Sequence, residues 1–180
     1  GQLSDKYGRK KLLFYCLAVT SISYFLAVVG IRQLNFMLLL ASRVLGGLMG
    51  GNIAIAQAVA ADITDKKDRT RVYGLLGAAF GIGFILGPYI GGKLSDPGLV
   101  SWFRIETPFL MAGLLSLVSV LVTWFLLPET HPFEKRPLHL RFWQSVIDIG
   151  EAISHKRLNT LFFIGFLFQF AFTMFVSFFG

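Results

Sequence analysis

Charged residues are scarce in this chain of 180 residues. They make up only 15% of the sequence, whereas an ordinary soluble domain carries about 25%. The few charges form short clusters between long uncharged runs, and 54% of all residues are hydrophobic. This composition argues against a soluble globular domain and predicts a protein of the membrane.

Several chemical signals are also missing. The single cysteine, Cys16, excludes an internal disulfide and a metal site built from cysteines alone. The histidines fit no common zinc spacing, and the sequence contains neither a P-loop nor a nucleophile elbow. We therefore expect no metal, no cofactor and no enzymatic activity. The net charge of +7 is not arranged as a basic stripe with base-stacking aromatic residues, so nucleic acid is not an expected partner.

Five stretches are long and apolar enough to cross a bilayer, which takes about 20 residues. They lack the polar face of a soluble helix and are too long for the strands of a membrane barrel. We therefore predict an all-α polytopic membrane helical bundle with five spanning helices. The predicted spans are residues 12–31, 35–61, 72–92, 107–127 and 158–180.

The orientation of the predicted spans follows from the lysines and arginines of the loops, which gather on the cytoplasmic side. In chain order the five loops contain four, one, four, two and five of these residues, so the counts alternate without a break. This alternation places residues 1–11, 62–71 and 128–157 in the cytoplasm, and residues 32–34 and 93–106 outside.

The first loop contains the pattern G-x-x-x-D-x-x-G-R-K, formed by Gly1, Asp5, Gly8, Arg9 and Lys10. On a helical turn Asp5 and Arg9 share a face, and Gly8 permits a backbone turn that other residues resist. For the charges alone, a positive-inside anchor is the simpler interpretation. The complete pattern resembles the loop between the second and third helices of the major facilitator superfamily.

Arg43 is the only charge inside a predicted span. An arginine at the centre of a membrane helix costs about 2.5–3.5 kcal/mol on insertion, so it normally faces the bundle interior or an aqueous cavity. The alternative is that its long side chain reaches outward to the lipid headgroups. On a regular helix Gln57 lies within about 40° of the Arg43 face, which makes it the expected companion on a cavity wall.

Glycines follow Arg43 in the same predicted span and allow another helix to approach closely. This run resembles the fourth helix of the superfamily, although Gly46 stands where many members have Gln. The glycines form two overlapping pairs at a spacing of four: Gly46, Gly47, Gly50 and Gly51.

The third predicted span contains the pattern G-x-x-x-G-P-x-x-G-G, formed by Gly83, Gly87, Pro88, Gly91 and Gly92. Pro88 lacks a backbone donor and the glycines remove bulk from one face, so a bent and closely packed helix is one sufficient explanation. The pattern also matches completely the antiporter signature that drug exporters of the superfamily carry in their fifth helix. This resemblance implies export by exchange with protons rather than sugar uptake.

Two further features of the sequence are weaker signals for the same family. Residues 127–130, L-P-E-T, resemble the end of the sixth helix in drug exporters and depart from the pattern of sugar porters. Asp62 follows the span that contains Arg43 and is either a partner of Arg9 or a solvated loop acid.

The resemblance covers the whole chain and implies five helices of a twelve-helix major facilitator fold. Residues 1–130 would form part of the amino-terminal bundle, with the loop between helices 2 and 3 and helices 3 to 6. Residues 131–157 would be a cytoplasmic linker whose amphipathic helix lies on the membrane surface or connects the bundles in solvent. Residues 158–180 would be the first helix of the carboxy-terminal bundle. We expect an internal fragment, with further helices outside it.

The implied function is a proton-coupled secondary transporter that exports drugs or other small amphipathic molecules by alternating access. Its partners would be the substrate, protons, the lipid bilayer and the missing helices, in a multi-pass protein of the bacterial inner membrane. A sugar or nutrient symporter of the same fold is the alternative. From another class, the alternative is a non-transporting membrane receptor or scaffold.

The resemblance also assigns roles to residues. The first loop and Asp62 would form a conformational latch, Arg43 would serve proton coupling, and the region of Gly87 and Pro88 would limit leakage. The fourth and seventh helices of the family line the cavity. This implies as substrate-cavity candidates Gln57, Phe166, Gln169, Phe170 and Thr173.

Overall fold

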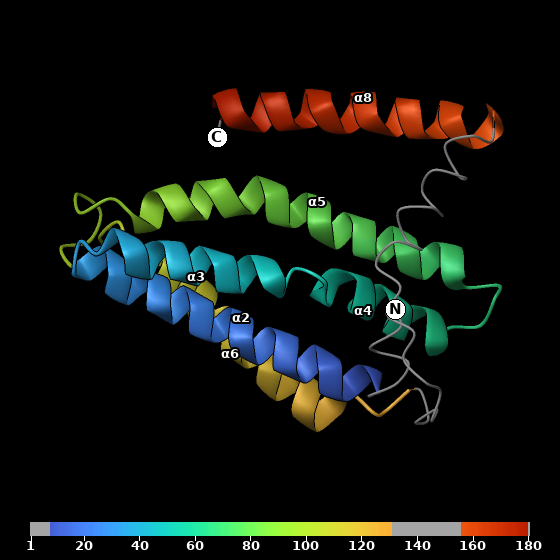
Figure 1. The fold of residues 1–180 in the computed structure, drawn as a ribbon, viewed down its shortest axis with the longest axis horizontal. Coiled ribbons are helices and arrows are strands. Elements are labelled where there is room, and N and C mark those ends of the chain that lie inside the picture. The colour runs from blue at the N-terminus through green and yellow to red at the C-terminus, as the bar shows by residue number, and fades with distance from the viewer. Residues whose placement is uncertain (1–7, 131–155, 180) are drawn as a thin grey trace. The chain divides into compact units, whose positions relative to one another are not determined.

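The computed structural model describes residues 8–130 and 156–179, and within these ranges the chain is helical without a strand. The chain divides into two compact units, Gly1–Arg136 and Pro137–Gly180. In chain order the helices are α2 (Arg9–Arg32), α3 (Phe36–Leu48), α4 (Asn52–Asp62), α5 (Arg69–Leu94), α6 (Thr107–Leu126) and α8 (Lys156–Phe179) (Figure 1).

Four stretches of the described chain are long and apolar enough to cross a membrane. They are α2, the pair α3 and α4 taken together as Phe36–Asp62, α5 and α6, and they correspond to the first four predicted spans. The all-α membrane bundle predicted from the sequence is confirmed in these ranges. Within α8 the apolar stretch Phe162–Met174 is shorter, so the fifth span stays a prediction.

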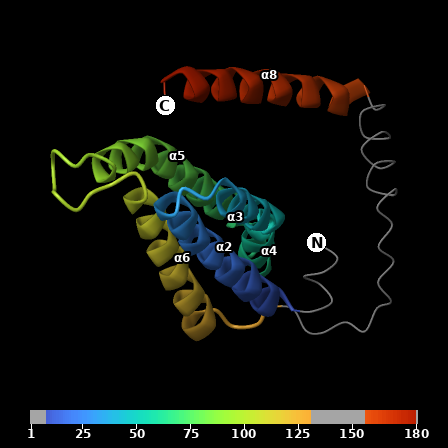
Figure 2. The same cartoon turned by 60° about the vertical axis from the view of Figure 1, so that its left-hand side comes forward.

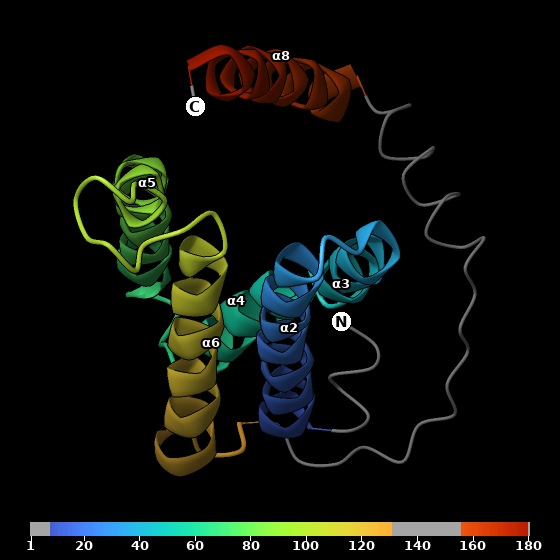
Figure 3. The same ribbon diagram turned by 90° about the vertical axis from the view of Figure 1, so that its left-hand side faces the viewer.

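Helix α2 lies between α6 and α3 (Figures 2 and 3). Its contact with α6 uses hydroxyl groups, because Ser21 Oγ donates to the carbonyl of Gly113 at 3.0 Å. Ser116 Oγ of α6 donates in return to the carbonyl of Leu17 at 3.3 Å. In a bilayer, small residues and hydrogen bonds between helices stabilise such contacts, since lipid tails are as apolar as the side chains they would replace.

The other face of α2 contacts α3 and α4. A small hydrophobic cluster joins α2 to α4 and consists of Leu13, Cys16, Ile55 and Val59. At the turn into α3 the backbones nearly touch, because a Cβ atom on Gly30 would lie 2.9 Å from the backbone nitrogen of Leu39. Gly46 of α3 also faces α2, and its Cβ atom would lie 3.1 Å from Ser23 Oγ. A larger residue such as Gln at position 46 would therefore require Ser23 of α2 to shift by a few tenths of an ångström.

The second predicted span, residues 35–61, is interrupted and is not one regular helix. Helix α3 ends at Leu48 and α4 begins at Asn52, although Figure 1 shows the two helices following one another along nearly one line. At the break the backbone NH groups of Gly50 and Asn52 donate three residues back, to the carbonyls of Gly47 and Met49. Adjacent glycines at 50 and 51 favour this break, because glycine is a poor helix former.

Helix α5 contacts α4 and α6 but buries none of its residues. It continues through Pro88 without ending. A Cβ atom built on Gly83, Gly87, Gly91 or Gly92 would meet nothing within 4 Å. Among the residues that the structure describes, nothing packs closely against these glycines, so this face of α5 is open to contact with another helix.

Candidate functional site

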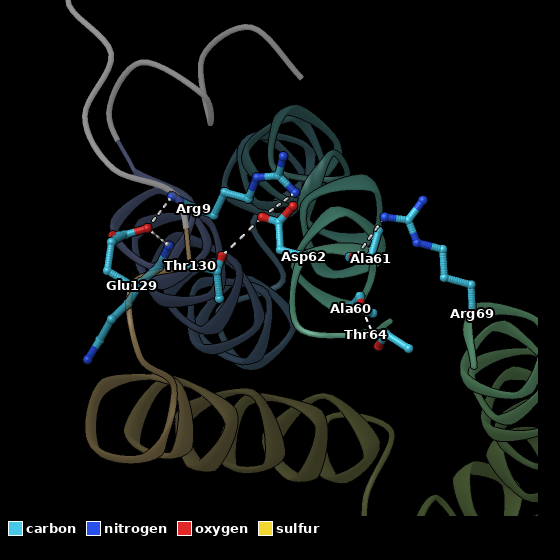
Figure 4. A network of polar contacts seen from close by, with 9 residues as sticks. Arg9, Ala60, Ala61, Asp62, Thr64, Arg69, Glu129 and Thr130 are labelled. Carbon is cyan, nitrogen blue, oxygen red and sulfur yellow. Dashed lines mark hydrogen bonds and ion pairs between the residues drawn. The ribbon is translucent and has the colours of Figure 1, made fainter. Parts of the chain in front are cut away.

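The ends of α2, α4 and α6 that are predicted to face the cytoplasm are joined by a polar network (Figure 4). Arg9 Nη1 at the start of α2 lies 2.7 Å from Asp62 Oδ2 at the end of α4. The two side chains are 14% and 26% exposed, so the ion pair is partly shielded from water. The structure thus pairs Arg9 with Asp62, one of the two possibilities that the sequence left open for this acid.

Glu129, which follows α6, caps the start of α2. Its Oε1 accepts hydrogen bonds from the backbone NH groups of Arg9 at 2.8 Å and Lys10 at 3.3 Å. The first NH groups of a helix have no partner within the helix, and the helix dipole favours a negative charge there. A carboxylate more than a hundred residues away in sequence therefore completes the first turn of α2.

Gly8 is required by this arrangement for two reasons. Its φ of 89° lies in the left-handed region, which other residues adopt only with strain. A Cβ atom at this position would also lie 2.6 Å from Glu129 Oε2. The Gly8 of the sequence pattern thus permits both the backbone turn and the close approach of the carboxylate.

The residue after Glu129 contacts α4. Thr130 Oγ1 donates to Asp62 Oδ2 at 3.3 Å, so Asp62 binds both Arg9 and Thr130. Arg69 at the start of α5 donates from Nη2 to the carbonyl of Ala61 at 3.3 Å (Figure 4). Residues 129 and 130 therefore link the ends of α2 and α4, and the start of α5 lies against the same turn.

Arg43 of α3 lies over an aromatic ring of α6. Its Cζ is 4.8 Å from the ring centroid of Phe109, a distance typical of a cation–π contact. Phe109 is in the first turn of α6, so this contact is near the predicted outer end of the unit. The cavity-facing and the outward-reaching interpretations of Arg43 both stay predictions.

The common face of Arg43 and Gln57 stays a prediction, and the break in the span removes one of its premises. The helical wheel that placed them on one face assumes a regular helix, and the break between α3 and α4 lies between them. Gln57 is exposed on α4, on the side away from the buried Ile55 and Val59.

The remaining cavity candidates lie along one face of α8, in the second unit. Phe166 and Phe170 stack with ring centroids 6.0 Å apart. Gln169 Nε2 donates to Thr173 Oγ1 at 3.5 Å. All four side chains are exposed. They form a strip of two aromatic rings beside one amide and one hydroxyl group.

Comparison with known proteins decides the family. A model of the Major Facilitator Superfamily matches residues 1–180, the whole chain. The chain belongs to the major facilitator superfamily.

This major facilitator chain is similar to a resistance protein of a bacterium and to a multidrug transporter of a fungus. It is 38% identical over 146 residues to the class C tetracycline resistance protein of Escherichia coli, covering 81% of this chain and 35% of that protein. It is also 38% identical over 148 residues to the major facilitator superfamily multidrug transporter mfsB of Aspergillus fumigatus, covering 76% of this chain and 24% of that protein.

A solved structure shares the fold. The crystal structure of the human organic anion transporter MFSD10 matches with a TM-score of 0.66 and 32% identity, covering 78% of this chain and 31% of that one. The chain spans about a quarter to a third of the length of these relatives. It is a multi-pass integral membrane protein of a transporter family and not an enzyme.

Among the predicted latch residues of this major facilitator chain, the structure joins Gly8, Arg9 and Asp62 in one network. Lys10 contributes its backbone NH, and its Nζ lies 5.9 Å from the ring centroid of Trp124. Gly1 and Asp5 lie outside the described residues, as does the linker from residue 131 to residue 155. Sequence reasoning missed the role of Glu129, whose only signal was its place in the L-P-E-T pattern.

Proposed function

We propose that this chain is part of a proton-coupled exporter of drugs or other small amphipathic molecules that works by alternating access. The observation that carries the proposal is the 38% identity to a tetracycline resistance protein over most of the chain. The complete glycine–proline pattern on α5 supports exchange with protons over sugar uptake. Helices outside this chain would complete two bundles that rock about a central substrate site.

In this proposal the network at the ends of α2 and α4 belongs to a latch that favours the state closed toward the cytoplasm. All of its described contacts lie within the first unit, so they act by holding the start of α2 in place. Arg43 would couple proton movement to transport. Gln57 and the exposed strip on α8 would contact substrate, with α8 as the first helix of the second bundle.

The bacterial tetracycline resistance proteins among its relatives favour a bacterial inner membrane as the location. Human and bovine relatives named major facilitator superfamily domain-containing protein 10 keep a eukaryotic membrane as the alternative.

The proposal is tested in the full-length protein reconstituted into vesicles with an imposed pH gradient. Movement of tetracycline against its gradient is measured for the unchanged protein, for Arg43→Ala and for Arg43→Lys. We expect Arg43→Ala to abolish accumulation while the protein is still made and inserted, and Arg43→Lys to keep part of it. Arg71→Ala, which removes an exposed charge at the start of α5, is the control and should transport normally.

Two results would contradict the proposal. Tetracycline movement that does not depend on the pH gradient would exclude proton coupling. Full activity of Arg43→Ala would leave Arg43 as a residue that merely reaches the headgroups.

Transport of organic anions is a second candidate, because the matching solved structure is that of an organic anion transporter. Adding a fluorescent organic anion to the same vesicles distinguishes transport of organic anions from transport of drugs such as tetracycline. Faster movement of the anion than of tetracycline, with competition by other anions, would favour this second function.

A further inference from the structure

A polar cavity of about 640 Å³ lies where the end of α2 meets the start of α6, on the side predicted to face outward. Two arginines line it, Arg32 and Arg104, together with the hydroxyl residues Ser101 and Thr107. The single carboxylate of the lining is that of Glu106. Two arginines against one glutamate give the lining residues a net formal charge of +1.

Arg32 has spare donors. Its Nε donates to Glu106 Oε1 at 3.3 Å, and the two side chains are 63% and 11% exposed. A guanidinium carries five NH donors, and this contact uses one of them. The carboxylate is therefore largely enclosed, while most of the Arg32 group is open to a further partner.

Arg104 is held at the cavity by its backbone. Its NH donates to Thr107 Oγ1 at 2.8 Å, and the NH of Thr107 donates to the carbonyl of Arg104 at 2.9 Å. These two reciprocal bonds fix the entry into α6 and leave the Thr107 hydroxyl hydrogen free to donate. The cavity thus brings charged and neutral donors together on a defined backbone.

We propose that this cavity binds the phosphate group of a phospholipid from the outer leaflet. A planar guanidinium matches the geometry of phosphate oxygens, and two arginines are among the residues that line this cavity. Trp102 also lines the cavity and is 63% exposed, and tryptophan is typical of the membrane–water interface. Leu110 adds an apolar wall on the α6 side, where the glycerol and upper acyl chain would lie.

The same donors would bind a soluble phosphate, and Trp102 and Leu110 are the reason to assign the site to a lipid. The inference depends on the predicted orientation of the chain and not on the proposed exporter function. A protein that transported no drug would bind the lipid equally well.

The test measures thermal unfolding of the full-length protein in detergent while a ligand is titrated. The three ligands are short-chain phosphatidylglycerol, short-chain diacylglycerol, which lacks the phosphate, and inorganic phosphate. We expect phosphatidylglycerol to raise the unfolding midpoint with saturation, and the other two to have little effect at the same concentrations. For each variant, the apparent affinity is taken from the rise of its unfolding midpoint with lipid concentration. Each variant is compared with itself without lipid, so differences in stability between variants do not affect the result.

The substitutions at the cavity should change the affinity for phosphatidylglycerol in opposite directions. Arg32→Gln and Arg104→Gln should each weaken phosphatidylglycerol binding by about tenfold, since each removes a charge-assisted contact. Glu106→Gln should strengthen it, because it removes the carboxylate that competes for Arg32. A loss of folding cannot imitate this gain. The control is Lys93→Gln, which removes one charge on the same predicted side but does not line the cavity, and its affinity should be unchanged.

Three outcomes would overturn the proposal. Equal binding of phosphatidylglycerol and diacylglycerol would exclude recognition of the phosphate. An equal loss in Lys93→Gln and in the two arginine variants would reduce the effect to general charge attraction. Stabilisation by inorganic phosphate with the same arginine dependence, and no further gain from the lipid, would keep the phosphate site but exclude a lipid as its source.

Discussion

Asp62 is the residue at which the network between the helix ends converges. It binds Arg9 Nη1 at 2.7 Å and accepts a hydrogen bond from Thr130. In the full-length protein, Asp62→Asn should raise the ratio of inward-open to outward-open molecules by up to about fivefold, because loss of the pair that holds the start of α2 would remove up to about 1 kcal/mol from the state closed toward the cytoplasm. Distance distributions between spin labels on the two cytoplasmic halves measure this ratio.

Asp65→Asn is the matched control for Asp62→Asn. Asp65 is an exposed acid three residues beyond Asp62, in the loop between α4 and α5, and its substitution should leave the ratio unchanged. Equal shifts in both variants would show that the loop responds to total charge and not to the pair with Arg9.

Gly8 provides a second prediction at the residue scale. Gly8→Ala forces a side chain into a left-handed backbone and against Glu129, and should destabilise the protein by about 1–3 kcal/mol. The double variant Gly8→Ala with Glu129→Ala should recover the part of this loss that comes from the collision. Thermal unfolding of the full-length protein measures both, and additive losses would show that Gly8 and Glu129 do not interact.

Phe109 provides a third prediction at the residue scale. If the ring holds the Arg43 guanidinium for coupling, Phe109→Leu should slow proton-driven transport about threefold and change its pH profile, in keeping with a contact of about 0.5–1 kcal/mol. Phe103→Leu changes an aromatic residue that packs on Trp102 instead and serves as control. A pH profile identical to that of the unchanged protein would separate Phe109 from the coupling role.

At the scale of helices, the break between α3 and α4 depends on two glycines with different surroundings. A Cβ atom on Gly50 would lie 3.2 Å from the carbonyl oxygen of Gly47, whereas one on Gly51 would meet nothing within 4 Å. Gly50→Ala should therefore lower the unfolding midpoint. Gly51→Ala should leave the free energy of unfolding unchanged or raise it by about 0.4–1 kcal/mol, as is typical of such substitutions. Equal losses in both variants would mean that the break needs glycine for flexibility alone.

At the scale of the whole molecule, the orientation in the bilayer is the prediction that most others depend on. In a full-length protein whose native cysteines are replaced, Lys67→Cys should be labelled by a membrane-impermeant reagent only from the cytoplasm. Ser95→Cys should be labelled only from outside, because the two positions lie at opposite ends of α5. Labelling of both from one side would contradict a spanning α5, and labelling with the two sides exchanged would reverse the orientation and move the proposed lipid site to the inner leaflet.

The sequence alone determined where the four membrane-spanning stretches lie. The thickness of a bilayer sets the length of an apolar run, and a charge inside it is costly, so both features can be read along the chain. It also determined the family, because the pattern in the first loop and the one on α5 are fixed spacings of glycine, proline and charge. The isolation of Arg43 was visible for the same reason.

Only the tertiary structure decided which of these residues meet. Glu129 reaches the start of α2 across a separation of 120 residues, and Phe109 of α6 lies over Arg43 of α3. The outer cavity likewise joins Arg32 of α2 to residues that precede and begin α6. Membrane helices associate through close fit and a few hydrogen bonds, and not through an apolar face turned away from water. Glycines at a spacing of four can mark a face for close approach, but they do not identify the partner helix, and the packed helices alone bring these side chains together.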